Sequence, residues 1–154
     1  MASKLDSSKH GAVAALAKRS YFAGRTVLET MLRPHGLGST QWYVLYQLAH
    51  DGPTMQRDLL RILQVERATL SGVVGALVRA GLVEQIPDHI DQRQKRLQLT
   101  KSGAALWATL PDPISLIHHT AFDGIDDADL ETTARVLRNA TERLDALSRK
   151  GPSQ

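Results

Sequence analysis

The sequence predicts a mainly α-helical fold that carries one small β-hairpin. Apolar residues recur at helical spacing through most of the 154 residues. The period changes to two only around residues 82–100, where two strand-like segments flank a polar stretch. With 42% hydrophobic residues, the chain can bury the core of one domain, or of one domain with a dimerisation appendage.

The N-terminal part of the chain predicts two helices. A long helix is expected over residues 8–32, and Pro34 ends it. Ser39 or Thr40 can cap a second, shorter amphipathic helix, which stops before Asp51.

Two further helices follow with a short connection between them. Thr54 is expected to cap a third helix over residues 55–63. Residues 64–66 connect it to a fourth helix over residues 67–80, which Gly81 stops. Two helices joined by so short a turn, the second amphipathic and polar at its start, are typical of a helix-turn-helix.

The hairpin comes directly after this pair of helices. Residues 82–86 are strand-like, Pro87 is expected to break the strand, and residues 96–100 alternate polar and apolar. A hairpin with a charged tip beside a helix-turn-helix is a β-wing, so the predicted architecture is a winged helix-turn-helix.

The remaining chain is helical again. A helix is expected over residues 101–110, Pro111 and Pro113 force a kink or break, and residues 114–122 resume the helix. The last helix is expected to begin near Asp126 or Asp127, where a carboxylate suits the positive end of a helix, and to end by Ser148.

The last helix carries a heptad-like apolar seam. Its leucines fall seven residues apart at Leu130, Leu137 and Leu144. Residues 149–154 are expected to be a disordered tail.

The composition excludes several classes of protein. The absence of cysteine excludes a disulfide framework, a thiol nucleophile and a cysteine-ligated zinc site. No apolar run approaches the roughly 20 residues needed to cross a bilayer, and residues 1–10 lack the apolar core of a signal peptide. We therefore expect a cytoplasmic protein with no membrane partner. Aromatic residues make up only 5%, which disfavours stacking on unpaired bases.

The charge is unevenly distributed along the chain. Residues 1–53 and residues 54–103 each carry a net charge of +3, whereas residues 104–154 carry −3. A basic portion of this kind favours a polyanionic partner, although similar imbalances occur on ordinary solvated surfaces.

The outward face of the fourth helix is made of small residues. At 100° per residue, the positions opposite the buried line are Ala68, Gly72, Gly75 and Arg79. Such a face allows close approach to a DNA major groove. Thr69 and Ser71 could then hydrogen-bond to bases or phosphates, Ala68 could touch a thymine methyl, and Arg67 could reach the backbone or a guanine. The alternative interpretation is a loosely specified surface helix.

Basic side chains gather at the expected hairpin tip. Arg93, Lys95 and Arg96 lie at or just after it, where they could enter a minor groove or clamp phosphates. Asp91 could orient Arg93. Basic hairpin tips also occur on inert sheets.

With these features, the sequence resembles the MarR family of winged-helix transcriptional regulators. The resemblance is carried by Gln41-Trp42-Tyr43-Val44-Leu45, Leu59-Leu60, Thr69-Leu70-Ser71, Leu77, Gly81-Leu82-Val83 and the run from Asp91 to Gly103, with its D-x-R and L-x-L-T-x-x-G patterns. It implies a homodimer in which the terminal helices intertwine, the helix over residues 67–80 enters the major groove, and Arg93 reaches the minor groove. Gln56 and Arg57 would meet the phosphate backbone.

The sequence departs from the family pattern at several positions. Gly72 replaces a residue that is often basic, and Gln85 stands where arginine is common. Pro111 and Pro113 interrupt a helix that is usually continuous.

The resemblance also implies an organisation of the chain. Residues 1–36 would form an N-terminal dimerisation helix, and residues 37–103 the winged helix-turn-helix DNA-binding lobe. Residues 104–148 would form C-terminal dimerisation helices, ahead of the tail.

A ligand pocket between the dimerisation helices and the DNA-binding lobe, often for phenolic or aromatic acids, is a further implication of the resemblance. The candidates to line it are Tyr21, Arg25, His35, Trp42 and Tyr46. The alternative is that these residues belong to the core or to an interface. Arg25 can pair with a carboxylate ligand or, equally, with Glu29 one helical turn away.

A metal site and an active site are not expected. His118 and His119, with His35, are the candidate ligands, but adjacent histidines on a helix point about 100° apart and cannot easily share one ion, and no H-x-x-x-H spacing or cysteine is present. No catalytic triad, carboxylate pair, phosphate loop or dinucleotide fingerprint stands in a plausible setting.

The expected protein is therefore not an enzyme and needs no cofactor. We expect a dimeric regulator of transcription that binds a double-stranded DNA operator, acts as a repressor, and responds to a small aromatic or phenolic effector. The alternative is a winged-helix protein-interaction module that does not bind DNA.

Overall fold

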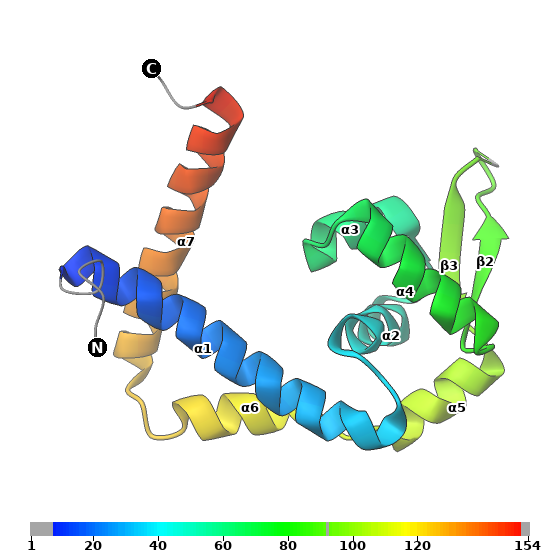
Figure 1. The fold of residues 1–154 in the computed structure, drawn as a ribbon, viewed down its shortest axis with the longest axis horizontal. Helices are drawn as coiled ribbons and strands as arrows, with labels where there is room; N and C mark the ends of the chain where they lie inside the picture. Colours follow the sequence, from blue (N-terminus) through cyan, green and yellow to red (C-terminus); the bar gives the residue numbers. More distant parts are fainter. Residues whose placement is uncertain (1–7, 92, 152–154) are drawn as a thin grey trace. The chain divides into compact units, whose positions relative to one another are not determined.

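A computed structural model describes residues 8–91 and 93–151 of the chain. They form two compact units, the first ending at Ile117 and the second beginning at His118, and each is described by itself. The elements are α1 (Lys9–Leu32), the 3-10 helix η2 (Arg33–His35), α2 (Ser39–Asp51), β1 (Thr54–Met55), α3 (Gln56–Leu63), α4 (Arg67–Arg79), β2 (Val83–Pro87), β3 (Lys95–Leu99), α5 (Lys101–Thr109), α6 (Pro113–Phe122) and α7 (Asp127–Lys150) (Figure 1). The expected fold class, mainly α with a small β-wing, is confirmed.

The sheet has three antiparallel strands in the order β1-β3-β2. The expected hairpin accounts for β2 and β3, and β1 is an additional strand. Thr54 pairs with Leu97 and Met55 with Arg96, so Thr54 is a strand residue and the expectation that it caps α3 is wrong. A strand of two residues is too short to show a period, which is why the sequence pattern does not reveal it. Pro87, expected to break its strand, is the last paired residue of β2. An edge strand tolerates proline at its end because no ladder N–H is needed there.

The core of the first unit lies between α2, α3, α4 and the sheet. It is built from Val44, Leu45, Leu48, Leu59, Leu70, Val74, Leu77, Val83 and Leu97. A second, smaller cluster joins Leu28 and Leu32 of α1 to Trp42 of α2. The apolar spacing of the fourth helix predicts a buried line of Leu70, Val73, Val74 and Leu77, and of these Val73 alone is only half-buried. α2 therefore lies at the centre of the unit, and α4 has one buried side and one open side.

The helix ends follow local chemistry, with one correction. The Ser8 hydroxyl accepts a hydrogen bond of 2.9 Å from the Gly11 N–H and caps α1, which begins at Lys9. Neither Ser39 nor Thr40 caps α2, because Gly38 holds the cap position and donates its N–H to Gln41 Oε1 at 2.9 Å.

The two prolines break the helix rather than bend it. α5 ends at Thr109, and α6 begins with Pro113 in its first turn, where its missing N–H costs nothing. The Asp112 carboxylate accepts from the Ser115 N–H at 3.1 Å and from the Ser115 hydroxyl at 2.7 Å, which fixes the start of the new helix.

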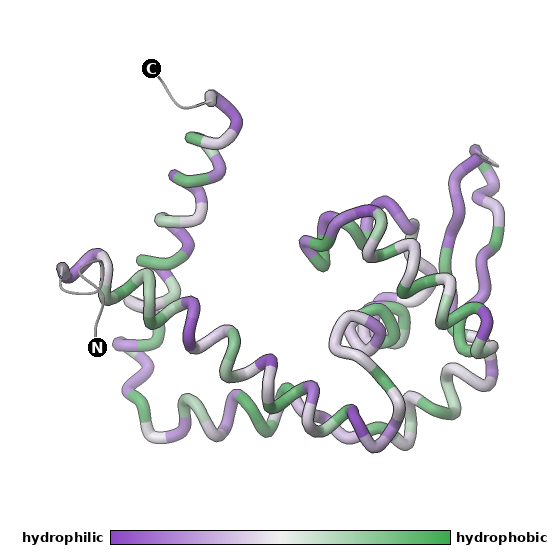
Figure 2. The backbone as a smooth tube through the Cα atoms, viewed as in Figure 1, coloured by the Kyte–Doolittle hydropathy of each residue, from purple (hydrophilic) through white to green (hydrophobic). Residues whose placement is uncertain are grey.

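The second unit is dominated by α7, which begins after Asp126 as expected. It continues to Lys150, so the expected end by Ser148 is wrong and Arg149 is helical rather than part of a disordered tail. Residues 152–154 of that expected tail lie outside the described residues. Figure 2 shows hydrophobic positions recurring along both α1 and α7.

Two expected absences can be compared with the described residues. No helix among them combines the length and apolar character needed to cross a membrane. Within residues 8–91 and 93–151, no three His, Cys, Asp or Glu side chains gather in a way that could hold a metal ion. His119 Nδ1 instead lies 3.1 Å from Oδ1 of Asp123, which directly follows the end of α6.

Candidate nucleic-acid interface

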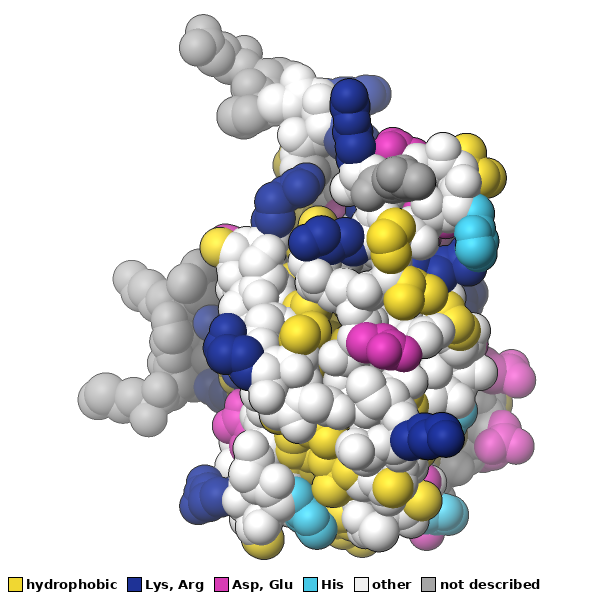
Figure 3. Space-filling view, turned by 90° about the vertical axis from the view of Figure 1, so that its right-hand side faces the viewer, with side chains coloured by type: hydrophobic (Ala, Val, Ile, Leu, Met, Phe, Trp, Pro, Cys, Tyr) yellow, Lys and Arg dark blue, Asp and Glu magenta, His cyan; other side chains and the backbone are white. Residues whose placement is uncertain are grey.

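A hollow of about 360 Å³ lies where the starts of α3 and α4 meet the hairpin, and we call it the interface hollow. It is lined by Met55, Gln56, Arg57, Leu60, Arg67, Leu70, Ser71, Arg93, Gln94 and Lys95. Six residues that the sequence singled out for DNA contact are brought together here: Gln56, Arg57, Arg67, Ser71, Arg93 and Lys95. Figure 3 looks onto the sheet side and shows Lys and Arg side chains close to the upper end of the sheet.

The additional strand β1 explains why α3 belongs to this surface. Because Met55 pairs with Arg96, the chain enters α3 directly beside the wing, which comprises β2, β3 and the residues between them. Gln64 then takes a left-handed conformation at φ +51° and turns the chain into α4. The expected short connection is confirmed, and it brings the first turn of α4 to the wall of the hollow opposite the wing.

The open side of α4 continues the surface. Ala68, Thr69, Ser71 and Gly72 are all exposed. A Cβ added at Gly72 would meet nothing within 4 Å, so packing inside the described protein does not require glycine there. Gly75 differs from the expectation, because it is half-buried and a Cβ there would lie 3.2 Å from Arg79 Nη1. The thin part of the face is therefore centred on Gly72 alone.

The wing tip is organised by carboxylates that bind backbone. Asp91 Oδ1 accepts from the Arg93 N–H at 3.0 Å, and Asp91 Oδ2 accepts from Gln94 Nε2 at 3.3 Å. Asp91 thus orients Arg93 through its backbone rather than its guanidinium. In the described part of the chain, no carboxylate forms an ion pair with Arg93, whose side chain is exposed.

Arg96 is not brought to the hollow. It lies on β3 next to Leu97, which is in the core, and alternation along a strand turns the two side chains to opposite faces. Arg96 is half-buried, unlike its exposed neighbour Lys95. The sequence places three cations near the wing but cannot say which face each takes, because the register of the central strand fixes that.

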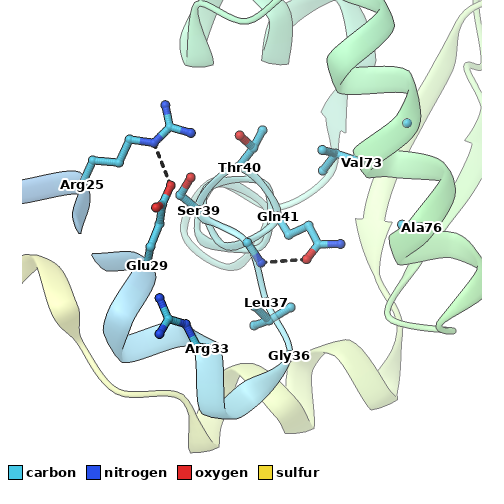
Figure 4. Close-up of a pocket in the computed structure, with 12 residues that line it drawn as sticks. Arg25, Glu29, Arg33, Gly36, Leu37, Ser39, Thr40, Gln41, Val73 and Ala76 are labelled. Atoms are coloured by element: carbon cyan, nitrogen blue, oxygen red, sulfur yellow. Dashed lines mark hydrogen bonds and ion pairs between the residues drawn. The ribbon is translucent and has the colours of Figure 1, made fainter. Parts of the chain in front are cut away.

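A second, larger cavity of about 630 Å³ lies between α1, α2 and α4, and we call it the helical cavity. It is lined by Arg25, Glu29, Arg33, Gly36, Leu37, Gly38, Ser39, Thr40, Gln41, Gly72, Val73 and Ala76 (Figure 4). Arg25 Nε donates to Glu29 Oε1 at 2.8 Å, and this hydrogen bond together with the Glu29 charge raises the pKa of Arg25 above its ordinary value. Arg25 therefore pairs with Glu29, which is one of the two partners that the sequence suggested for it.

Of the five expected ligand residues, Arg25 alone lines the helical cavity. Trp42 and Tyr46 contact each other, with ring centroids 5.2 Å apart. Trp42 is only 1% exposed and belongs to the core. Tyr46 stacks on His50 with ring centroids 4.1 Å apart. Tyr21 contacts Phe22 at 5.4 Å, and His35 is exposed in η2. For Trp42, the core interpretation holds.

Sequence reasoning missed most of the helical cavity. Arg33, Leu37, Thr40 and Val73 carry no local pattern that marks a pocket. They come from separate segments that only tertiary packing brings together. The one available signal was the open face of α4, since Gly72 and Ala76 on that face also line the cavity.

Comparison with known proteins supports the family resemblance. Residues 35–94 match the model of the MarR family. The chain is 39% identical over 83 residues to the transcriptional activatory protein BadR of Rhodopseudomonas palustris, covering 51% of this chain and 46% of BadR. It is 33% identical over 91 residues to the transcriptional repressor NicR of Pseudomonas putida, covering 59% of this chain and 58% of NicR. The chain thus spans about half the length of these curated relatives.

The fold also matches solved structures. A structure of BpsR from Bordetella bronchiseptica, which concerns regulation of its DNA binding by 6-hydroxynicotinic acid, superposes with a TM-score of 0.70 at 24% identity. The match covers 84% of this chain and 98% of BpsR. These three proteins are described as regulators of transcription or as DNA-binding, not as enzymes. Over residues 35–94 the chain is therefore similar to the MarR family, and the two relatives are regulators of transcription.

Proposed function

We propose that the chain is a dimeric, sequence-specific regulator of transcription that binds double-stranded DNA. The observation that carries this proposal is the interface hollow, because α3, α4 and the wing bring their predicted contact residues to one surface. The lean face around Gly72 lets α4 lie in a major groove, and Arg93 reaches the adjacent minor groove. Because the proposed partner is an operator on DNA, we also propose that the protein acts in the cytoplasm.

The charges of the hollow suit a duplex. Arg57, Arg67, Arg93 and Lys95 are all exposed and come from three different elements. Cations spread in this way can contact phosphates on both sides of a groove, which fixes the register of α4 on the DNA. Ser71 lies in the same hollow and is placed to hydrogen-bond to a base or phosphate.

The proposed dimer uses apolar side chains that each unit leaves exposed. On α1, Leu16 is 60% and Phe22 49% exposed, and on α7, Leu144 is 64% and Leu147 55% exposed. A second copy of the chain is the partner that covers such faces most economically, because each copy supplies the complementary surface. The heptad spacing of Leu137 and Leu144 fits helix-on-helix packing.

We propose that the regulator is a repressor. Occupancy of an operator excludes other proteins from it without any further contact, whereas activation needs an additional surface for the transcription machinery. The relatives include both an activatory protein and a repressor. A reporter gene placed behind the selected operator tests whether the protein represses or activates transcription.

Selection of bound duplexes from a random pool tests the proposed function. We expect enrichment of near-palindromic sites whose half-sites lie about one helical turn apart, as a two-fold dimer demands. If no duplex is enriched or bound at low salt, the DNA-binding proposal fails and the protein-interaction module becomes the better reading.

Replacing Arg93 by alanine is expected to weaken binding to all duplexes alike. Each phosphate-neutralising cation contributes about one unit to the slope of log affinity against log salt, so a dimer should lose about two units. The measurement is fluorescence anisotropy over a salt series. Lys101→Ala, an exposed cation outside the hollow, is the matched control and should keep the wild-type slope. Equal slopes for Arg93→Ala and wild type would remove the wing from the mechanism.

We propose that a small aromatic or phenolic acid binds in the helical cavity and modulates DNA affinity. Its volume lies within the range of about 300–1,000 Å³ usual for small-molecule sites. Leu37, Val73 and Ala76 offer an apolar wall, and the Arg33 guanidinium a cation (Figure 4). Because Val73 and Ala76 belong to α4, an occupant would contact the DNA-binding helix directly. BpsR, whose DNA binding is regulated by 6-hydroxynicotinic acid, supplies a probe.

Arg33→Ala is expected to weaken binding of 6-hydroxynicotinic acid by about 10- to 100-fold, since a charged hydrogen bond contributes about 1.5–3 kcal/mol. Calorimetric titration measures the affinity. His35→Ala is the matched control, because His35 is an exposed basic residue of the same 3-10 helix that does not line the cavity. Equal loss in both variants, or none in either, would contradict the site.

A further inference from the structure

The tip of the wing carries an isoleucine with almost no contact to the rest of the described protein. Ile90 is 96% exposed, whereas the next most exposed large apolar residues within the described ranges are Tyr21 at 65% and Leu144 at 64%. A single exposed apolar residue is common on protein surfaces. This one, however, stands three positions from Arg93 in the same turn.

The turn that presents Ile90 is fixed by its own hydrogen bonds. The Asp88 N–H donates to Gln94 O at 3.1 Å, and the Gln94 N–H donates to Asp91 O at 2.9 Å. The Asp88 carboxylate accepts from the Asp91 N–H at 3.4 Å, and the Asp91 carboxylate accepts from the Arg93 N–H at 3.0 Å. The backbone on both sides of Ile90 is therefore tied down.

These bonds also separate the charges at the tip. Asp88 and Asp91 are half-buried because their carboxylates turn toward the backbone. His89, Ile90 and Arg93 are exposed. The tip therefore exposes an apolar side chain and a cation three residues apart, while its two carboxylates bind backbone, so a polyanion can approach it closely.

We propose that Ile90 is an apolar DNA contact that enters the minor groove beside Arg93, an inference that rests on the proposed DNA-binding function. The walls of a minor groove are deoxyribose edges, which an aliphatic side chain can cover, and apolar side chains that include isoleucine are known to enter minor grooves, where they insert between base steps. Arg93 supplies charge and Ile90 supplies apolar burial. Because apolar burial releases no counterions, the contribution of Ile90 to affinity does not depend on salt.

The test is a salt series of duplex affinities on a selected operator. Ile90→Ala should bind at least about tenfold more weakly than wild type at every salt concentration, since it removes three carbon atoms of buried surface from each protomer of the dimer. Its salt slope should equal that of wild type, whereas Arg93→Ala should lower the slope. Ile90→Leu, which keeps the apolar volume, should restore most of the affinity.

Two controls keep the result interpretable. Because Ile90 is almost fully exposed, the melting temperature of Ile90→Ala should match that of wild type. Ile62→Ala makes the same chemical change on α3, at a residue that is 46% exposed and does not line the hollow, and should leave affinity unchanged.

The outcomes separate the two proposals. If Ile90→Ala binds like wild type while Arg93→Ala is weakened, the apolar contact is overturned and the proposed function stands. If Ile90→Ala changes the salt slope, the apolar contact is also overturned. If wild type binds no duplex, both proposals fall.

Discussion

Alanine at position 103 is expected to destabilise the protein by about 3 kcal/mol or more, the upper part of the range for overpacked sites. A Cβ on Gly103 would lie 2.0 Å from Leu82 O and 2.9 Å from Leu82 C. Leu82 O also accepts the Thr100 N–H at 3.1 Å, and the Thr100 hydroxyl donates to Gly81 O at 2.6 Å. The Leu82 backbone cannot easily shift, because these two hydrogen bonds fix it and its neighbour Gly81. The start of α5 would therefore have to move away from Leu82.

Thermal unfolding of Gly103→Ala measures this effect, with an expected fall of about 10 °C for a chain of this size. Gly72→Ala is the matched control, because its Cβ meets nothing within 4 Å and alanine is about 1 kcal/mol better than glycine inside a helix. A Gly103→Ala protein that melts at the wild-type temperature would show that the start of α5 can move away from the Leu82 backbone without cost.

Leucine at position 72 is expected to abolish operator binding while leaving the fold intact. In the isolated protein the new side chain points into open space, and the helix interior gains propensity. On DNA the same side chain would hold α4 away from the groove floor. Several contacts worth about 1–3 kcal/mol each would then be lost together, so affinity should fall at least about 100-fold.

Anisotropy titration and thermal unfolding of Gly72→Leu, measured side by side, separate these effects. Gly72→Ala should bind with an affinity between wild type and Gly72→Leu. A Gly72→Leu protein that is stable and still binds its operator tightly would refute close approach by α4.

Much of the fold follows from the sequence because the signals are local. The apolar spacing of α4, ending at Gly81, and the alternation of β3 are visible within a few residues. The strand at Thr54 is not, because its only evidence is pairing with Leu97, which lies far along the chain. For the same reason the sequence assigned the start of α3 to a side-chain cap that the structure does not contain.

The candidate interface was predictable to the extent that it follows from helical and strand periodicity. Ser71 and Arg93 lie where those periods place them. The packing of Arg79 against Gly75 and the partial burial of Arg96 depend on side-chain conformation and register, which no pattern of residue types encodes. The helical cavity depends on three segments meeting, so Arg25 is the one lining residue that the sequence named as a ligand contact.

The salt dependence of duplex affinity for the wild-type protein tests the interface most directly. Arg57, Arg67, Arg93 and Lys95 provide four cations per protomer in the interface hollow. A dimer that uses most of them should show a slope of log affinity against log salt between about −4 and −7, losing roughly 10² to 10⁴ in affinity from 50 to 200 mM salt. Duplex binding that is absent at low salt, or that hardly changes across this range, would contradict a surface in which α3, α4 and the wing meet the phosphates together.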